Sequence, residues 1–290
     1  MKVNLILKEY IVNTRINFNN LLKFGGNLMI YNIVLANPAN NITIIVLDYI
    51  DKENYSNIAN SMLKNSKFGA EQVGFVKKPI MDGKLRLEMM GGEFCGNALR
   101  SFGMMIAKNN EIEKGIVTVE ITGSDKSLNV EVDNINKSAK TEVPLPKGIE
   151  YVRIDELLEF PVVMFEGIYH AIVEGIEANE ENFSYIKNSV MKRYNIEALG
   201  VMFFDRERYF ITPVVYVRDT DTTVFESSCG SGTIATALCL SDGYKDSVFK
   251  CSINQPGGVI DSEIYKSEGR VTKLIIGGKV ELSEVIEIEI

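Results

Sequence analysis

The sequence has no tryptophan and little histidine or cysteine. It contains one histidine and four cysteines among 290 residues. There is no Cys-x-x-Cys pair, and one histidine cannot complete a zinc-ligand set with these cysteines, so we expect no metal site. Four cysteines in a chain of this length do not make a disulfide framework. The sequence therefore predicts reduced thiols and a cytoplasmic protein.

Basic charge and long hydrophobic runs are also scarce. Lys and Arg number 31 against 39 Asp and Glu, which gives a net charge of −8. An acidic chain has no positive field for phosphate backbones or anionic bilayers, so we expect neither a nucleic-acid nor a membrane partner. The most apolar runs, such as residues 42–46, are strand-sized and far shorter than the ~20 residues of a membrane span. The hydrophobic content of 46% is sufficient for one or two domains with sizeable cores.

Two short segments share the pattern of a cysteine, a glycine and a small polar residue. They are Cys95-Gly96-Asn97 and Cys229-Gly230-Ser231, and helices are predicted directly after them, at 98–107 and 233–240. A cysteine just before a helix lies near unpaired N–H groups and the positive end of the helix dipole, which favour a thiolate. Two such cysteines suggest paired acid and base chemistry. The alternative is that both are small apolar core residues.

The cysteines fall in two halves with a similar order of elements. The Pro- and Gly-containing segment 144–148 is the best candidate for a linker between the halves. Helical spacing predicts helices at 53–63 and 181–193. Strands are predicted at 32–35, 42–48, 73–77, 84–89, 116–121, 128–132, 162–165, 170–173, 201–204 and 212–217. We infer a duplicated unit with one cysteine in each copy; the alternative is that the two Cys-Gly turns are alike by chance.

Several motifs occur in the order found in a known family. Asn41 closes the first turn, and Glu-Gln-Val-Gly-Phe follows at 71–75. The two cysteine turns come next, and Gln-Pro-Gly-Gly stands at 255–258. In this combination the chain, over residues 31–290, resembles the cofactor-independent amino-acid racemases and epimerases of the diaminopimelate epimerase type.

The resemblance implies an α+β fold of two pseudo-symmetric domains, each a curved, mostly antiparallel sheet wrapped around a central helix. The first domain is then 29–146 plus about 277–290, with Cys95, and the second is 147–276, with Cys229. Residues 1–28 are an N-terminal extension to which we assign no role. The oligomeric state stays open, a homodimer included.

The resemblance also implies a mechanism without pyridoxal phosphate or any other cofactor. Cys95 and Cys229 would act as bases and acids on opposite faces of the substrate α-carbon. The helix N-termini would hold the α-carboxylate. The implied substrate-binding residues, for a small amino-acid substrate, are Asn41, Glu71, Gln72, Gly96, Asn97, Gly230 and Ser231.

The departures from diaminopimelate epimerases indicate a different substrate. Gly200 falls where those enzymes place an asparagine, and Val217 replaces the acid of their Glu-Arg pair. The histidine racemase branch resembles the chain more closely, through the segments that begin at Glu71, Glu93, Glu226 and Gln255. L- and D-histidine are therefore the leading substrates. A diaminopimelate epimerase, a racemase of another amino acid, and an inactive binding module on this scaffold are the alternatives.

Two further residues are candidates for catalysis. His170 would orient or polarise one thiol, and Glu226 would position a thiol or keep it protonated, because a neighbouring carboxylate raises a thiol pKa. Glu71 is the expected partner of a substrate imidazole N–H. The alternatives are a satisfied core or surface histidine, a solvated Glu226, turn chemistry for Asn41 and a solvent-facing Gln72. We expect Cys239 and Cys251 in the core.

Overall fold

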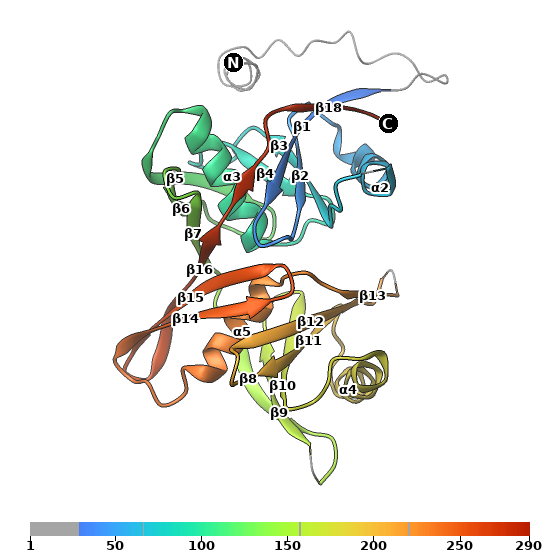
Figure 1. Cartoon of the computed structure of the whole chain (residues 1–290), viewed down its shortest axis with the longest axis vertical. Coiled ribbons are helices and arrows are strands. Elements are labelled where there is room, and N and C mark those ends of the chain that lie inside the picture. The colour runs from blue at the N-terminus through green and yellow to red at the C-terminus, as the bar shows by residue number, and fades with distance from the viewer. Residues whose placement is uncertain (1–28, 66, 157, 220) are drawn as a thin grey trace. The chain divides into compact units, whose positions relative to one another are not determined.

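The computed structural model describes residues 29–65, 67–156, 158–219 and 221–290, so the predicted extension 1–28 lies outside the described residues. The fold is α+β, as predicted, with many more strands than helices (Figure 1). The described residues form two compact units. The first comprises 29–38, Ile42–Ala139 and Val280–Ile290, and the second comprises Ala39–Asn41 and Lys140–Lys279. The expected linker 144–148 therefore lies inside the second unit, after its boundary at Ala139.

In the first unit, a sheet surrounds the helix that follows Cys95. Its main strands are β1 (Ile30–Asn37), β2 (Thr43–Val46), β3 (Gln72–Lys77), β4 (Arg86–Met89), β5 (Lys114–Ile121) and β6 (Leu128–Asp133). The C-terminal strands β17 (Glu281–Leu282) and β18 (Ile286–Glu289) pair with β1, and Figure 1 shows this dark-red segment beside blue β1. Pairing is antiparallel except for β2 with β3 and β4 with β5.

The second unit is built on a similar plan. Its strands are β7 (Ser138–Val143, whose first two residues belong to the first unit), β8 (Gly148–Arg153), β9 (Glu159–Met164), β10 (Ile168–Glu174), β11 (Ala198–Asp205), β12 (Phe210–Val217), β13 (Thr222–Phe225), β14 (Ser247–Gln255), β15 (Gly258–Ser267) and β16 (Arg270–Lys279). β10 pairs with β11, and β12 with β14, in parallel. The pairs β8–β9, β9–β10, β11–β12, β12–β13, β14–β15 and β15–β16 are antiparallel.

The two units repeat one order of elements. In the first, α2 (Tyr55–Asn65) connects the parallel strands β2 and β3, and α3 (Gly96–Asn109) connects β4 and β5. In the second, α4 (Glu180–Arg193) connects β10 and β11, and α5 (Gly230–Leu240) lies between β12 and β14. Each cysteine therefore precedes the second crossover helix of its unit. The same order of strands and crossover helices therefore surrounds both cysteines.

The helices that follow the cysteines are the most buried helices of the two units. Residues 97–107 of α3 are all buried, as are 232–238 of α5. α3 packs on β1, β5 and β6, and α5 packs on β10, β11, β14, β15 and β16. A helix that is buried all round sits inside its sheet rather than on one face of it. By contrast, α2 and α4 cover the outer faces with single apolar stripes, in which Met62 and Ile186 are buried.

The sequence predicted the cysteine helices and the central strands, with end positions off by a few residues. The helix expected at 53–63 is a 3-10 turn, Lys52–Asn54, followed by α2. β7, β8 and the strands from β13 to β18 were not predicted. In β13 and β14 most residues are exposed, so their strand pattern in the sequence is weak.

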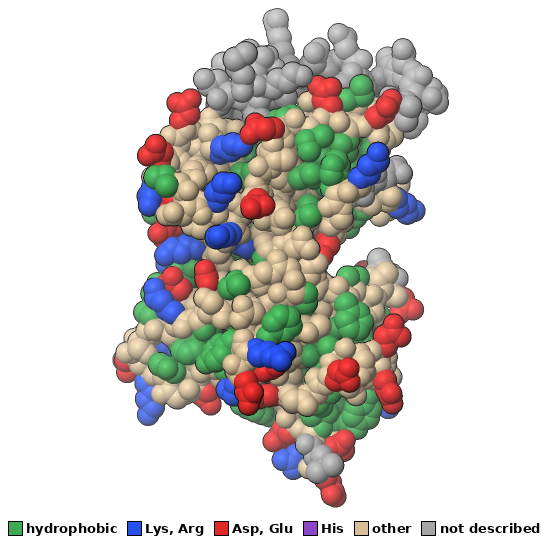
Figure 2. Space-filling view, in the orientation of Figure 1, with side chains coloured by type: hydrophobic (Ala, Val, Ile, Leu, Met, Phe, Trp, Pro, Cys, Tyr) green, Lys and Arg blue, Asp and Glu red, His purple; other side chains and the backbone are tan. Residues whose placement is uncertain are grey.

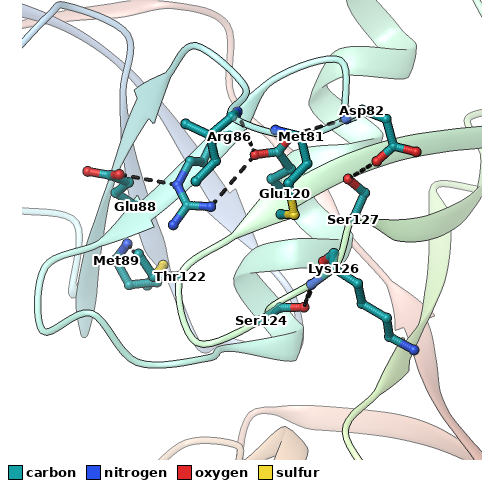
Figure 3. A network of polar contacts seen from close by, with 12 residues as sticks. Met81, Asp82, Arg86, Glu88, Met89, Glu120, Thr122, Ser124, Lys126 and Ser127 are labelled. Carbon is teal, nitrogen blue, oxygen red and sulfur yellow. Dashed lines mark hydrogen bonds and ion pairs between the residues drawn. The ribbon is translucent and has the colours of Figure 1, made fainter.

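A buried carboxylate organises the loop before β4 (Figure 3). Glu120 is fully buried in β5, and its carboxylate accepts N–H groups from Ile80, Met81 and Gly83 at 2.8–3.1 Å. It also lies 3.7 Å from the guanidinium of Arg86, which sits at the start of β4. Buried charge is tolerated only when it is paired and hydrogen-bonded. Glu120 thus holds the loop that leads into β4, the strand that precedes the Cys95 turn.

The surface carries charge of both signs. On the face drawn in Figure 2, acidic and basic side chains are interspersed, which is typical of solvent-facing surfaces. Within the described ranges, no helix has the length and apolarity needed to cross a membrane.

Candidate functional site

Each candidate cysteine is the N-cap of a buried helix. Cys95 caps α3 and Cys229 caps α5, with nearly the same backbone angles (φ −128°, ψ 109° and φ −128°, ψ 112°). In both, Sγ accepts the backbone N–H three residues later at 3.4 Å, from Ala98 and Gly232. The helices begin at the following glycines, two or three residues earlier than predicted. The predicted position of a thiol at a helix N-terminus is therefore confirmed twice.

The thiol pKa values run opposite to the simple expectation for a helix N-terminus. Loss of solvent raises the pKa of Cys95 to about 11, although the Ala98 N–H and Gln72 lower it. Burial and then the charge of Glu226 raise the pKa of Cys229 well above its usual value. The desolvation penalty on the charged form exceeds the stabilisation from the helix. Both pKa values therefore favour neutral thiols near pH 7.

Gln72 supports the Cys95 thiol. It begins β3, and its Nε2 donates to the Oγ1 of buried Thr43 at 3.0 Å. The amide also hydrogen-bonds the Cys95 side chain in the sense that lowers the thiol pKa. An NH2 group has two donors, one for each contact. Gln72 is therefore not the solvent-facing side chain of the alternative interpretation, and it contacts a candidate catalytic atom.

The end of β5 anchors the Cys95 turn. The Thr122 hydroxyl accepts the N–H of Met89 at 3.0 Å and donates to the carbonyl of Glu93 at 3.0 Å. Gly123 has φ +75°, and a Cβ there would lie 2.5 Å from the backbone nitrogen of Phe94. Sequence reasoning missed both residues, because the contact joins segments about thirty residues apart and no local pattern signals it.

His170 reaches the Cys229 thiol through Ser231. The imidazole Nε2 lies 2.9 Å from Ser231 Oγ, which lies 3.6 Å from Cys229 Sγ. His170 is fully buried, and burial lowers its pKa to about 3, so the ring is neutral. Nδ1 has no hydrogen-bond partner within the described ranges. A buried N–H without an acceptor is costly, so we assign the proton to Nε2, which donates to Ser231.

Gly200 makes room for the imidazole. It faces His170 across the β10–β11 pair, and a Cβ at position 200 would lie 2.3 Å from Nδ1. Real Cβ atoms do not approach ring atoms this closely, so His170 would have to move. The glycine noted in the sequence as a departure from epimerases therefore has a steric role next to the Cys229 site.

Glu226 raises the pKa of the Cys229 thiol, whereas the hydrogen bond from Ser231 lowers it. The charge of Glu226 raises the pKa of Cys229, and its carboxylate also hydrogen-bonds the thiol, which raises that pKa further. The backbone N–H of Glu226 donates to the Pro213 carbonyl at 2.9 Å, which holds the residue at the end of β13. A carboxylate that accepts S–H stabilises the protonated thiol. This position fits an acid that keeps its proton until it is needed.

The remaining predicted residues are divided between the units. Asn97 is buried in α3 and accepts from Nε of fully buried Arg100 at 3.1 Å, and Glu71 is half-buried directly before β3. Asn41 is buried in the second unit. Gly96 and Gly230 are the first residues of α3 and α5. No cluster of three or more potential metal ligands occurs in the part of the chain that is described.

The comparison with known proteins agrees with the geometry. The sequence model described as "Histidine racemase CntK N-terminal domain" matches residues 31–285. The chain belongs to the histidine racemase family. A histidine racemase from Fusobacterium nucleatum subsp. nucleatum is 33% identical over 89% of this chain and 96% of its own length. One from Staphylococcus aureus is 25% identical over 77% of this chain and 85% of its own.

Solved structures show the same fold at much lower identity. A hydroxyproline epimerase from Agrobacterium vitis matches this histidine racemase family member with a TM-score of 0.60 and 10% identity, over 90% of this chain and 92% of that one. A probable proline racemase from Agrobacterium radiobacter matches with a TM-score of 0.58 and 12% identity, over 88% and 93%. These structures share the fold, and membership of the histidine racemase family makes the protein an isomerase of the amino-acid racemase and epimerase class.

The expectation for the remaining two cysteines of this histidine racemase family member was wrong. Cys239 and Cys251 are only half-buried, not core residues. Cys239 lies near the end of α5, and Cys251 lies in β14 beside the exposed Lys250 and Ser252. Neither is an N-cap, so the feature that distinguishes Cys95 and Cys229 is their position at a helix start and not burial alone.

Proposed function

We propose that the protein interconverts L- and D-histidine, with Cys95 and Cys229 as the two acid/base groups. The observation that carries the proposal is the pair of N-cap thiols with matching backbone conformation, one in each unit. Membership of the histidine racemase family supports the choice of substrate. In this proposal the units are pseudo-symmetric domains that present one thiol to each face of the substrate α-carbon. The repeated order of strands and helices supports that arrangement.

The chemistry requires one thiolate and one thiol. The thiolate takes the α-proton, the electron pair of the C–H bond is delocalised into the substrate carboxylate, and the second thiol protonates the opposite face. The two cysteines end with exchanged protonation states, so the reverse reaction uses them in exchanged roles. Backbone N–H groups at the starts of α3 and α5 would bind the carboxylate and stabilise its developing charge. In this proposal, stabilisation of the carboxylate by these N–H groups takes the place of the electron sink that a cofactor would supply.

The surroundings of the two thiols favour one starting state. Gln72 donates to Cys95 and stabilises its thiolate, whereas Glu226 accepts from Cys229 and stabilises its thiol. We infer that, in this starting state, Cys95 is the base that removes the α-proton and Cys229 is the acid that protonates the opposite face. Ser231 and His170 then stabilise the Cys229 thiolate that this step leaves. Since both pKa values are raised, the substrate ammonium supplies the charge that assists thiolate formation.

The imidazole of the substrate needs its own partner. Glu71 is a half-buried carboxylate beside Gln72 and is suited to accept an imidazole N–H. Asn41 is the proposed contact for the polar α-substituents. Glu71→Gln should raise KM for histidine while the far-ultraviolet circular dichroism stays unchanged. Histidine kinetics identical to those of the parent protein would remove Glu71 from the proposal.

The decisive experiment is proton exchange in heavy water, followed by NMR with L-histidine and L,L-diaminopimelate in separate tubes. We expect loss of the α-proton signal for histidine only, with D-histidine appearing on chiral chromatography. Cys95→Ala and Cys229→Ala should abolish racemisation, and Cys251→Ala, a half-buried cysteine elsewhere, should not. Exchange of diaminopimelate alone would assign an epimerase activity instead. Exchange of neither would overturn the histidine assignment.

A further inference from the structure

A buried glutamine closes a ring of hydrogen bonds around the backbone of Cys229. Gln255 is 4% exposed and ends β14. Its Oε1 accepts the Cys229 N–H at 2.7 Å, and its Nε2 donates to Thr233 Oγ1 at 2.9 Å. The Thr233 hydroxyl donates to the Cys229 carbonyl at 2.6 Å. One side chain therefore holds the N–H of Cys229 directly and its carbonyl through Thr233.

The turn after Gln255 fastens the same segment at a second point. The Gly257 N–H donates to the Ser227 carbonyl at 2.7 Å. A Cβ at Gly257 would lie 2.4 Å from the Ala39 carbonyl oxygen and 3.0 Å from Ser227 Cβ, so the turn is tightly packed between these segments. The Gln-Pro-Gly-Gly motif thus holds the backbone of residues 227–229 by hydrogen bonds at both ends. The first unit has a comparable anchor, because Thr122 binds the carbonyl two residues before Cys95.

We propose that Gln255 is a positioning residue that fixes the Cys229 thiol for proton transfer. An N-cap cysteine has its N–H outside the helix ladder, and a free N–H there would let the turn rotate. Displacement of a reacting group by about 1 Å costs on the order of a hundredfold in rate. An amide fits the ring, because it accepts from Cys229 with one end and donates to Thr233 with the other. The kinetic part of this inference depends on the proposed racemase function.

The test uses two substitutions and one matched control. Gln255→Met keeps the length of the side chain but removes both hydrogen bonds, and Gln255→Glu keeps the acceptor but adds negative charge beside the thiol. Ser252→Ala is the control, because Ser252 is exposed on the same strand and its hydroxyl donates to Asp261. For each protein, mass spectrometry follows iodoacetamide labelling of Cys229 and Cys95 against pH, alongside histidine racemisation.

In Gln255→Met we expect kcat to fall roughly 10- to 100-fold with little change in KM. Labelling of Cys229 should become roughly 5- to 100-fold faster, because loss of a buried hydrogen bond populates the open turn by such a factor. In Gln255→Glu the Cys229 labelling midpoint should move up by about one pH unit. The labelling of Cys95 should not change in either variant. In Ser252→Ala, racemisation and the labelling of both cysteines should match the parent protein.

The labelling results decide the proposal even without turnover. If Cys229 labelling in both variants matches the parent protein, Gln255 does not position the thiol. Equal acceleration at Cys95 and Cys229 would also overturn it, because that pattern reports general loosening. If the parent protein fails to racemise histidine while Cys229 alone responds, the proposed function is wrong and the positioning role stands.

Discussion

His170 contacts Ser231, with Nε2 2.9 Å from Oγ, and it is this serine that lies next to the Cys229 thiol. The histidine is neutral because burial lowers its pKa to about 3, so it cannot serve as an imidazolium partner for a thiolate. Its role in the proposed reaction is to donate to Ser231 and thereby orient the serine hydroxyl toward sulfur. The sequence analysis assigned Ser231 only to substrate binding, whereas the structure places it between His170 and the Cys229 thiol.

This chain of contacts predicts strong coupling between the two residues. Ser231→Ala should reduce kcat about tenfold, because one hydrogen bond to a developing thiolate is lost. His170→Gln alone should have a similar effect, but in the Ser231→Ala background it should add little. Steady-state racemisation by the two single variants and the double variant measures this. Fully additive losses would show that His170 acts by another route.

Gly200→Ala should displace the imidazole. The added methyl would lie 2.3 Å from His170 Nδ1, and overpacking of this kind costs about 1–3 kcal/mol of unfolding free energy. Racemisation should fall along with stability, as measured by urea denaturation and turnover. Gly148→Ala in β8 is the matched control, since its nearest neighbour is the flexible end of Met164. Equal stability of the two variants would contradict the steric role of Gly200.

The buried histidine makes stability depend on pH in a defined window. The folded-state pKa of His170 is lowered to about 3 from 6.5, so the unfolded chain binds the proton more readily. The contribution of neutral His170 to the free energy of unfolding is fully present above pH 6.5. It is lost as the pH falls toward 3, by about 1.4 kcal/mol per pH unit. The chain has no other histidine, so His170→Gln should flatten the urea-denaturation profile between pH 6.5 and 5. Parallel profiles for both proteins would refute the assignment.

Glu226→Gln should make Cys229 easier to deprotonate. The carboxylate raises the pKa of this thiol by its charge and by its hydrogen bond, and a neutral amide removes the charge. The pH midpoint of Cys229 labelling by iodoacetamide should therefore fall, while that of Cys95 stays constant. Racemisation should slow, because the proposed acid loses the group that keeps it protonated. A Cys229 midpoint that stays in place would exclude Glu226 as its partner.

The sequence was sufficient to place both thiols at helix starts, because Cys-Gly turns and helical spacing involve neighbouring residues. The α+β class came from the resemblance to a known family. The direction of the thiol pKa values was not predictable, because burial depends on strands far along the chain. The contact of Thr122 with the Cys95 turn was missed for the same reason, since 29 residues separate it from Glu93. The motif at Gln255 was recognised, but its contact with Cys229, 26 residues away, was not. The exposed strands β13 and β14 gave too weak an apolar pattern to recognise.

The pairing of β1 with the chain's last strands has a consequence for the order of events during synthesis. Ile30–Asn37 is made before the second unit, but two of its partners, Glu281–Leu282 and Ile286–Glu289, are made after it. The second unit is nearly continuous in sequence, from Lys140 to Lys279. On the ribosome it can therefore close before the first unit does. A nascent chain that stops at Lys279 would leave β1 with an open edge, ready to pair with another copy.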